Sequence, residues 1–212
     1  KKTEQFIKAV KKLDKRQDEF HDYNLTALAY TSDGDVYHIK AGLGEYSEND
    51  IAIEGACYKG KENVVIICSD HTRPVPSNHI IPFMLKEIRE GNPDAKITLL
   101  IATGFHRATT REELVGKFGE EIVDNECIAI HDSQDMDAMA NIGTLPSGAP
   151  LLINKIAANA DLLVSEGFIE THFFAGFSGG RKSILPGVSS KVTVLGNHCS
   201  KSVSYTHLRA HE

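Results

Sequence analysis

Short apolar runs, separated by longer segments of helical character, most constrain what this chain can fold into. The clearest runs are NVVIICS (63–69), KITLLIATG (96–104) and CIAIHD (127–132). Runs of this length and apolarity are typical of strands that are covered on both faces. A helical segment at about 77–90 follows the first run, and another begins at Thr109 or Thr110, each of which precedes a glutamate by three residues in a capping-box pattern. Strands that alternate with helices predict an α/β fold with a mostly parallel, Rossmann-like sheet and flanking helices.

Two further runs extend the pattern, and an N-terminal region precedes it. APLLINK (149–155) and DLLVSEG (161–167) are predicted as the fourth and fifth strands. LTALAYTSDGDVYHIKAG (25–42) predicts a hairpin, because the turn residues at 32–34 separate two apolar stretches. Residues 1–20 are predicted to form a polar helix. The chain is therefore divided into an N-terminal helix and hairpin region (1–62) and an α/β domain (63–201).

The C-terminal residues 202–212 follow no periodic pattern. They are similar to a translated adapter of the kind used in preparing sequencing libraries, and we interpret them as a non-native tail. The alternative is an ordinary frayed terminus.

Composition excludes several classes of function. Charged residues make up 25% of the 212 residues and the formal net charge is -6, which gives no electrostatic case for binding nucleic acid or an anionic membrane. No apolar run approaches the roughly 20 residues that a membrane span needs. The 4 cysteines are scattered without a C-x-x-C pair, a usage typical of reduced thiols in a cytoplasmic protein.

Polar residues follow three of the predicted strands at their carboxyl ends. Asp70 and Arg73 follow the first run, His106 follows the second, and Glu166 and His172 follow the fifth. Ligands of open parallel sheets bind beyond these ends, so the side chains are expected to converge on one site. Taken singly, each has a simpler interpretation: a turn or helix cap for an aspartate, a surface ion pair for an arginine, a structural hydrogen bond for a histidine. Their convergence favours an active site.

The glycine-rich stretch GFSGGRKS (176–183) is similar to a phosphate-binding loop but departs from it. In the pattern G-x-x-x-x-G-K-[ST], Arg181 stands where the second glycine belongs, which argues against a standard nucleotide triphosphatase. The backbone N–H groups around Ser178, Gly179 and Gly180 could still bind an anion. Lys182 could instead act as a nucleophile or an attachment point.

Five motifs in order carry a resemblance to a known family: SDHTRPVPS, ATGFHRATTREEL, LPSG, EGFIETHFFAGFSGGRKSILPG and NHCS. From about 63 to 201 the chain resembles the N-terminal half of the nickel-dependent lactate racemases. The resemblance implies a nickel-pincer nucleotide, a pyridinium mononucleotide with two sulfur-containing arms, joined to Lys182 through a thioamide. It implies His198 as the nickel ligand. Asp70, Ser178, Gly179 and Gly180 are then expected to support the cofactor, with Asp70 alternatively supporting Arg73.

The resemblance also implies a reaction, racemisation of lactate or a related 2-hydroxy acid by hydride transfer. His106 and His172 would be the two bases and Arg73 would bind the substrate carboxylate. Proteins that synthesise the cofactor would be partners. A second α/β domain of the family is absent from this chain, so the fragment itself is expected to be inactive or nearly so. The particular hydroxy acid and the oligomeric state stay open.

Two competing hypotheses remain. A nucleotide- or phosphate-binding protein that uses the GFSGGRKS loop would bind a triphosphate with magnesium and leave Lys182 unmodified. The second hypothesis is a non-catalytic relative of the family. The presence of all five expected polar residues argues against this hypothesis: Arg73, His106, His172, Lys182 and His198.

Overall fold

The computed structural model describes residues 24–31, 36–42, 52–53, 61–169, 171–172 and 176–198. The expected helix at 1–20 and the expected tail at 202–212 lie outside the described residues. Within the described residues, no helix is long and apolar enough to cross a membrane.

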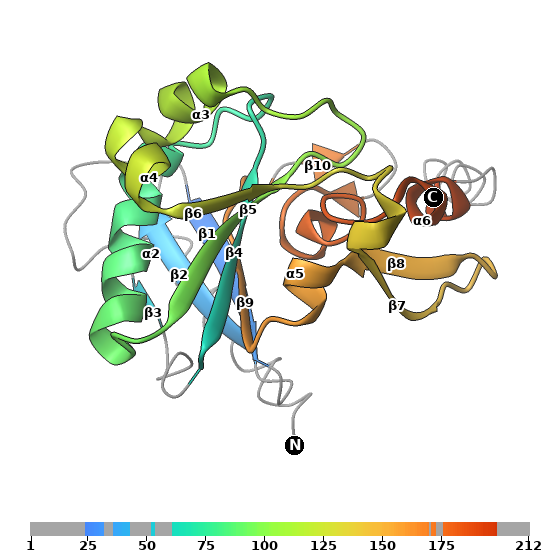
Figure 1. The fold of residues 1–212 in the computed structure, drawn as a ribbon, viewed down its shortest axis with the longest axis horizontal. Helices are drawn as coiled ribbons and strands as arrows, with labels where there is room; N and C mark the ends of the chain where they lie inside the picture. The colour runs from blue at the N-terminus through green and yellow to red at the C-terminus, as the bar shows by residue number, and fades with distance from the viewer. Residues whose placement is uncertain are drawn as a thin grey trace.

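A seven-stranded sheet with the order β3-β2-β1-β9-β4-β5-β6 forms the centre of the fold (Figure 1). Its strands are β1 (Asn24–Thr31), β2 (Val36–Gly42), β3 (Ala52–Ile53), β4 (Asn63–Ser69), β5 (Lys96–Ala102), β6 (Cys127–Ile130) and β9 (Leu162–Ser165). The pairs β9–β4, β4–β5 and β5–β6 are parallel, whereas β1, β2 and β3 are antiparallel to their neighbours. The predicted α/β class, the parallel sheet and the N-terminal hairpin are confirmed. The hairpin extends the same sheet, because β1 pairs with β9.

Helices pack on both faces of the parallel strands. They are α2 (Ser77–Gly91), α3 (Arg111–Phe118), α4 (Glu120–Asn125) and α5 (Lys155–Ala158). A further helix, α6 (Lys191–Asn197), packs against the strand β8 (Pro150–Asn154). Alternate residues of β4 enter two cores: Ile66 packs with residues of α2, α3 and α4, and Ile67 packs with Ala157 of α5 and Val188. This division explains why the β4 sequence is apolar throughout rather than alternating.

The start of α3 follows the predicted capping signal. Thr110, not Thr109, is the N-cap: its hydroxyl accepts a hydrogen bond from the backbone N–H of Glu113, whose carboxylate accepts from the Thr110 N–H. Both groups satisfy donors that a helix start would otherwise leave unpaired.

The predicted fourth strand is a strand but does not belong to the central sheet. β8 (Pro150–Asn154) pairs antiparallel with β7 (Met139–Thr144), a strand that sequence analysis missed, in a separate two-stranded ribbon. The ribbon lies to one side of the central sheet (Figure 1). Much of β7 is exposed, so it lacks the apolar run of a strand covered on both faces.

The order of the parallel strands reverses beside β4. From β4 the chain proceeds outward through β5 and β6, then returns to place β9 on the other side of β4. In open α/β sheets, ligands bind in the crevice beyond the carboxyl ends at such a reversal. The segments after β4, β5 and β9 all lead to that edge. Beyond β9 lie the short paired strands β10 (Thr171–His172) and β11 (Gly176–Phe177).

Candidate active site

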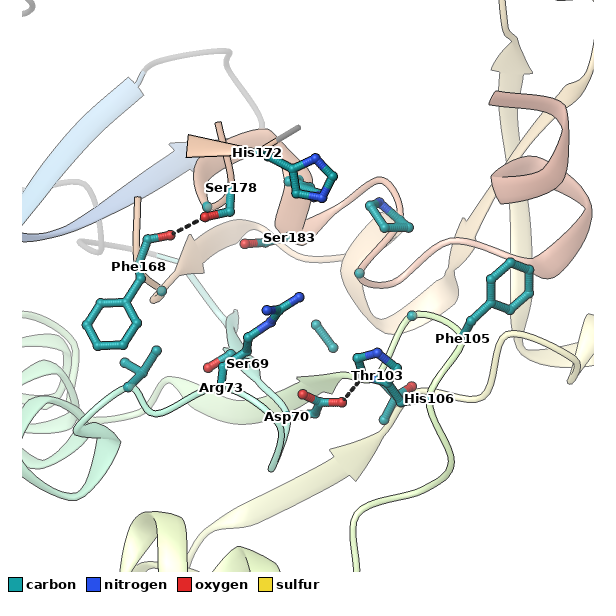
Figure 2. A pocket seen from close by; sticks show the side chains of 18 of the residues that line it. Ser69, Asp70, Arg73, Thr103, Phe105, His106, Phe168, His172, Ser178 and Ser183 are labelled. Atoms are coloured by element: carbon teal, nitrogen blue, oxygen red, sulfur yellow. Dashed lines mark hydrogen bonds and ion pairs between the residues drawn. The ribbon is translucent and has the colours of Figure 1, made fainter. Parts of the chain in front are cut away.

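A cavity of about 450 Å³ lies at the carboxyl edge of the sheet, where the segments after β4, β5 and β9 meet (Figure 2). It is lined by nearly all of the predicted site residues: Asp70, Arg73, His106, His172, Ser178, Gly179, Lys182 and His198. Gly180 is not among the residues that line it, and instead begins the short 3-10 helix η3 (Gly180–Ser183) that carries Lys182. The predicted convergence of the strand ends is therefore found in the structure.

Asp70 and His106 form a hydrogen-bonded pair on one wall. Asp70 is only 2% exposed, and its Oδ2 lies 2.5 Å from Nδ1 of His106. Its Oδ1 accepts hydrogen bonds from the backbone N–H of Thr72 at 3.1 Å and the Thr72 hydroxyl at 2.6 Å. Burial by itself raises the pKa of Asp70, but the hydrogen bonds from Thr72 and His106 outweigh it, and the pKa falls below its ordinary value. Asp70 is therefore ionised.

An ionised Asp70 fixes the imidazole of His106. A carboxylate accepts hydrogen bonds only, so Nδ1 of His106 carries the proton and Nε2 keeps the lone pair of a base. From the sequence, Asp70 was expected to support the cofactor or Arg73, whereas in the structure its carboxylate contacts His106. The contact joins residues from two different strand ends, and no local sequence pattern indicates it.

Tight backbone contacts hold the His106 turn after β5. The His106 N–H donates to the Thr103 carbonyl at 2.8 Å, and the Gly104 N–H donates to the Gly187 carbonyl at 2.9 Å. Gly104 has a φ of 55, in the left-handed region that favours glycine. The next residue, Arg107, makes two hydrogen bonds to the Glu113 carboxylate, at 2.8 and 2.5 Å. Arg107 thus supports the start of α3 and is not among the cavity-lining residues.

His172 belongs to the opposite wall, and the Arg73 side chain extends into the space between this wall and His106 (Figure 2). Lys182 lines the same cavity. Burial, followed by the positive charges of Lys182, Arg73 and His198, lowers the pKa of His172. Burial and then the charge of Arg73 lower the pKa of Lys182. Both shifts favour the neutral forms, in which an imidazole is a base and an amine is a nucleophile.

The glycine loop does not have the architecture of a nucleotide triphosphatase. Only the four-residue η3 follows Gly179, and the strand before it is the two-residue β11 of a small ribbon. Gly179 has a φ of 75, and a Cβ there would lie 2.6 Å from the Phe168 carbonyl oxygen, so glycine is needed for close packing as well as for conformation. Ser178 donates to the same carbonyl at 3.2 Å. The loop is therefore packed tightly against the segment after β9.

His198 lies at the C-terminal end of α6 and lines the cavity. Its Nδ1 is 3.1 Å from the Val194 carbonyl, an acceptor, so Nδ1 carries the proton and Nε2 has the lone pair that a metal would use. The described residues contain no group of three or more His, Cys, Asp or Glu side chains that could hold a metal ion. Among the described residues, His198 thus offers one nitrogen to a metal, and a metal held there would need further ligands from elsewhere.

Several residues that line the cavity received no role from the sequence, Phe105 and Glu166 among them. Phe105, 48% exposed, lies next to His106. Glu166, 3% exposed, follows β9 directly, and burial raises its pKa despite hydrogen bonds from Ser69 and Ser77. The sequence signal that could have identified Glu166 is the same as for Asp70: both are carboxylates directly after an apolar strand.

The fold and the cavity define an α/β domain with a candidate ligand site at the carboxyl edge of its sheet. Comparison with known families is more specific. The chain belongs to the family of the lactate racemase N-terminal domain, whose model matches residues 47–208.

Two curated relatives are both lactate racemases. The one from Thermoanaerobacterium thermosaccharolyticum is 59% identical over 151 residues, which cover 71% of this chain and 35% of the relative. The one from Lactiplantibacillus plantarum is 60% identical over 146 residues, covering 69% and 34%. The chain thus spans about a third of the length of these relatives.

Two solved structures are similar in fold. The lactate racemase apoprotein from T. thermosaccharolyticum has a TM-score of 0.69 and 48% identity, over 84% of this chain and 46% of that one. A Thermotoga maritima protein has a TM-score of 0.53 and 21% identity, over 70% of this chain and 37% of that one, a likeness of fold alone.

Proposed function

We propose that the protein to which this chain belongs racemises lactate, or a closely related 2-hydroxy acid, with a nickel-pincer nucleotide held on Lys182. The observation that carries the proposal is the arrangement of the cavity: two histidines lie on facing walls with an arginine between them (Figure 2), and a lysine and a third histidine line the same cavity. Membership of the lactate racemase family supports the same reaction.

Arg73 is the group suited to the substrate carboxylate. Its guanidinium is permanently charged and presents parallel N–H donors, which match the two oxygens of a carboxylate. The side chain is exposed to the cavity. A carboxylate bound there would place the α-carbon and its hydroxyl group between the two histidines.

His106 and His172 are suited to move the hydroxyl proton. His106 would use Nε2, because Asp70 holds the proton on Nδ1. The lowered pKa of His172 favours the neutral base. Racemisation requires a base for each enantiomer, since the hydroxyl groups of the two forms point in different directions when the carboxylate is fixed. One histidine would accept the proton from the enantiomer that enters, and the other would return a proton to the enantiomer that leaves.

The cofactor would contact the wall that carries the glycine loop. Lys182 would hold it covalently, His198 would bind the nickel through Nε2, and Ser178 and Gly179 would lie beside it. When bound, it supplies an electrophile that takes up the substrate's α-hydrogen as hydride and gives it back, so that no carbanion need form.

The proposal extends to partners and location. Proteins that synthesise the cofactor and load it onto Lys182 are the expected partners, and the cytoplasm, where thiols stay reduced, is the expected location. A nucleotide- or phosphate-binding protein is the alternative function. The short η3 and the two-residue β11 weigh against it, since a phosphate-binding loop joins a sheet strand to a full helix.

The test is a measurement on the full-length protein produced with nickel and the cofactor-synthesising enzymes. We expect the peptide containing Lys182 to gain the mass of the cofactor and the protein to racemise lactate in a chiral assay. Lys182→Ala should lose both, while Lys86→Ala, which changes an exposed lysine on α2, should lose neither. Folded protein with an unmodified Lys182 and no racemisation would refute the proposal.

A further inference from the structure

Glu166 is a buried acid that the proposed reaction does not use. Its hydrogen bonds to the described residues are all made by Oε1, which accepts from the Ser69 N–H at 3.2 Å, the Ser69 hydroxyl at 3.4 Å and the Ser77 hydroxyl at 3.0 Å. Its Oε2 is buried without a hydrogen-bond partner among the described residues. Buried polar groups are normally satisfied, so such an arrangement calls for a specific reason.

The serines bound to Glu166 stand at the two ends of one loop. Ser69 is the last residue of β4 and Ser77 is the first residue of α2. The segment between them, residues 70–76, carries Asp70 and Arg73. One carboxyl oxygen from the end of β9 therefore joins both ends of the 70–76 loop to the strand that leads to His172.

Lys117 holds the middle of the same loop. Its Nζ donates to the backbone carbonyl of Arg73 at 3.0 Å from its position on α3. Burial lowers the pKa of Lys117, and the negative charge of Glu166 is the largest influence that opposes this shift. Glu166, which follows β9, and Lys117, on α3, thus both bind the 70–76 loop. Their charges also interact with each other.

We propose that Glu166 and Lys117 are positioning residues that fix the 70–76 loop and thereby orient Arg73 toward the cavity. The value of that orientation rests on the proposed function, in which Arg73 binds the substrate carboxylate. The fixing of the loop does not depend on the proposed function, and it can be measured without a substrate.

Glu166→Gln and Glu166→Ala separate this role from general packing. Glutamine has nearly the same shape as glutamate and keeps a carbonyl oxygen that can stand in for Oε1 as an acceptor. Glutamine can therefore keep the bonds from Ser69 and Ser77, whereas alanine cannot. Ser77→Ala removes one of these bonds with little loss of volume and carries the same test if Glu166→Ala does not fold.

Asp161→Ala is the matched control. Asp161 is also a carboxylate that accepts from β4, but its bonds go to the N–H groups of Glu62 and Asn63 at the opposite end of that strand. It should weaken β4 without affecting the 70–76 loop.

The experiment is amide hydrogen exchange on the full-length apoprotein, combined with KM and kcat for lactate on the cofactor-loaded form. The Thr72 and Arg73 amides report on the loop, since both are bonded to Asp70. We expect Glu166→Ala and Ser77→Ala to speed their exchange about ten-fold or more, with Glu166→Gln and Asp161→Ala close to the wild type. In the loaded enzyme, Glu166→Ala should raise KM more than it lowers kcat, and should add no further loss in an Arg73→Lys background.

Unchanged exchange in the 70–76 loop of folded Glu166→Ala would overturn the proposal. So would an equal rise throughout α2 and β5, or a full additional kinetic loss in the Arg73→Lys background, because each would indicate ordinary structural stabilisation. Failure of the proposed function has a different signature, a wild-type protein that does not racemise lactate while the exchange results stand.

Discussion

Replacing Asp70 with asparagine removes the charge that fixes the His106 tautomer, while the volume stays nearly the same. Asp70 is buried, and its bond to His106 Nδ1 is short. An asparagine can present its NH₂ group to Nδ1 while its oxygen keeps the bonds from Thr72. Nδ1 would then become the acceptor, and the proton would move to Nε2, where the base is needed.

The size of the effect follows from the lost interaction. A hydrogen bond to a charged group contributes ~1.5–3 kcal/mol, and the lower half of that range applies because the His106 side chain is 47% exposed. A loss of ~1.5–2 kcal/mol in the transition state corresponds to a fall of about 10–30-fold in kcat/KM. Because the two enantiomers have equal free energy, kcat/KM must fall by the same factor in both directions.

The assay is chiral detection of lactate from each enantiomer, with the full-length, cofactor-loaded Asp70→Asn protein. Nickel content and the mass of the cofactor-bearing peptide should match the wild type, which separates a proton-transfer defect from a loading defect. Asp161→Asn, at the other end of β4, is the control and should keep wild-type kinetics. A loaded, folded Asp70→Asn enzyme with unchanged kcat/KM would refute the role assigned to the Asp70–His106 pair.

Three further predictions concern the loop, the metal and the core. Gly179→Ala should destabilise the protein by ~1–3 kcal/mol in urea unfolding and reduce cofactor loading, because alanine would adopt a φ of 75° and approach a backbone carbonyl. Gly116→Ala, at an exposed position of α3 where a Cβ meets nothing within 4 Å, should be neutral or stabilising. His198→Ala should lose nickel by metal analysis while the cofactor-bearing lysine keeps the organic part of its modification, and loss of neither would contradict the assigned ligand. Burial lowers the pKa of His131, so the folded state favours the neutral imidazole. The resulting stability is fully present above the pKa of His131 in the unfolded chain, and it is lost as the pH falls from there through the lower pKa of the folded state. Between pH ~7.5 and ~5.5 the wild type should therefore lose more free energy of unfolding than His131→Gln, and equal losses would contradict this cause.

Sequence patterns predicted those parts of the fold whose signals are local. The apolar runs of β4, β5 and β9 marked strands covered on both faces, and the capping box marked the start of α3. The position of the site followed from a general rule about parallel sheets, so that the cavity residues could be named before their distances were known.

Features that depend on contacts between distant segments could not be read in this way. β8 has the composition of a strand, but its partner β7 carries little apolar signal, so its membership of a separate ribbon was not predictable. Asp70 meets His106 because two loops from neighbouring strands approach each other. The hydrogen bonds of Glu166 likewise join the end of β9 to β4 and α2. No residue spacing along the chain indicates these contacts.

The position of β9 has a consequence for the order in which the chain can fold during synthesis. β9 pairs with β1 on one side and β4 on the other, although the segments of β1 and β4 are translated much earlier. The nascent β1–β2 hairpin therefore cannot pair with the rest of the sheet until residues 162–165 have been synthesised. The strands β4, β5 and β6 can already pair with one another before that point. Until then the edge of β4 is open to pairing with other chains, a period of aggregation risk. Arrival of β9 closes that edge and brings the His172 wall to the Asp70 wall, so a chain that can accept its ligand has already completed its sheet.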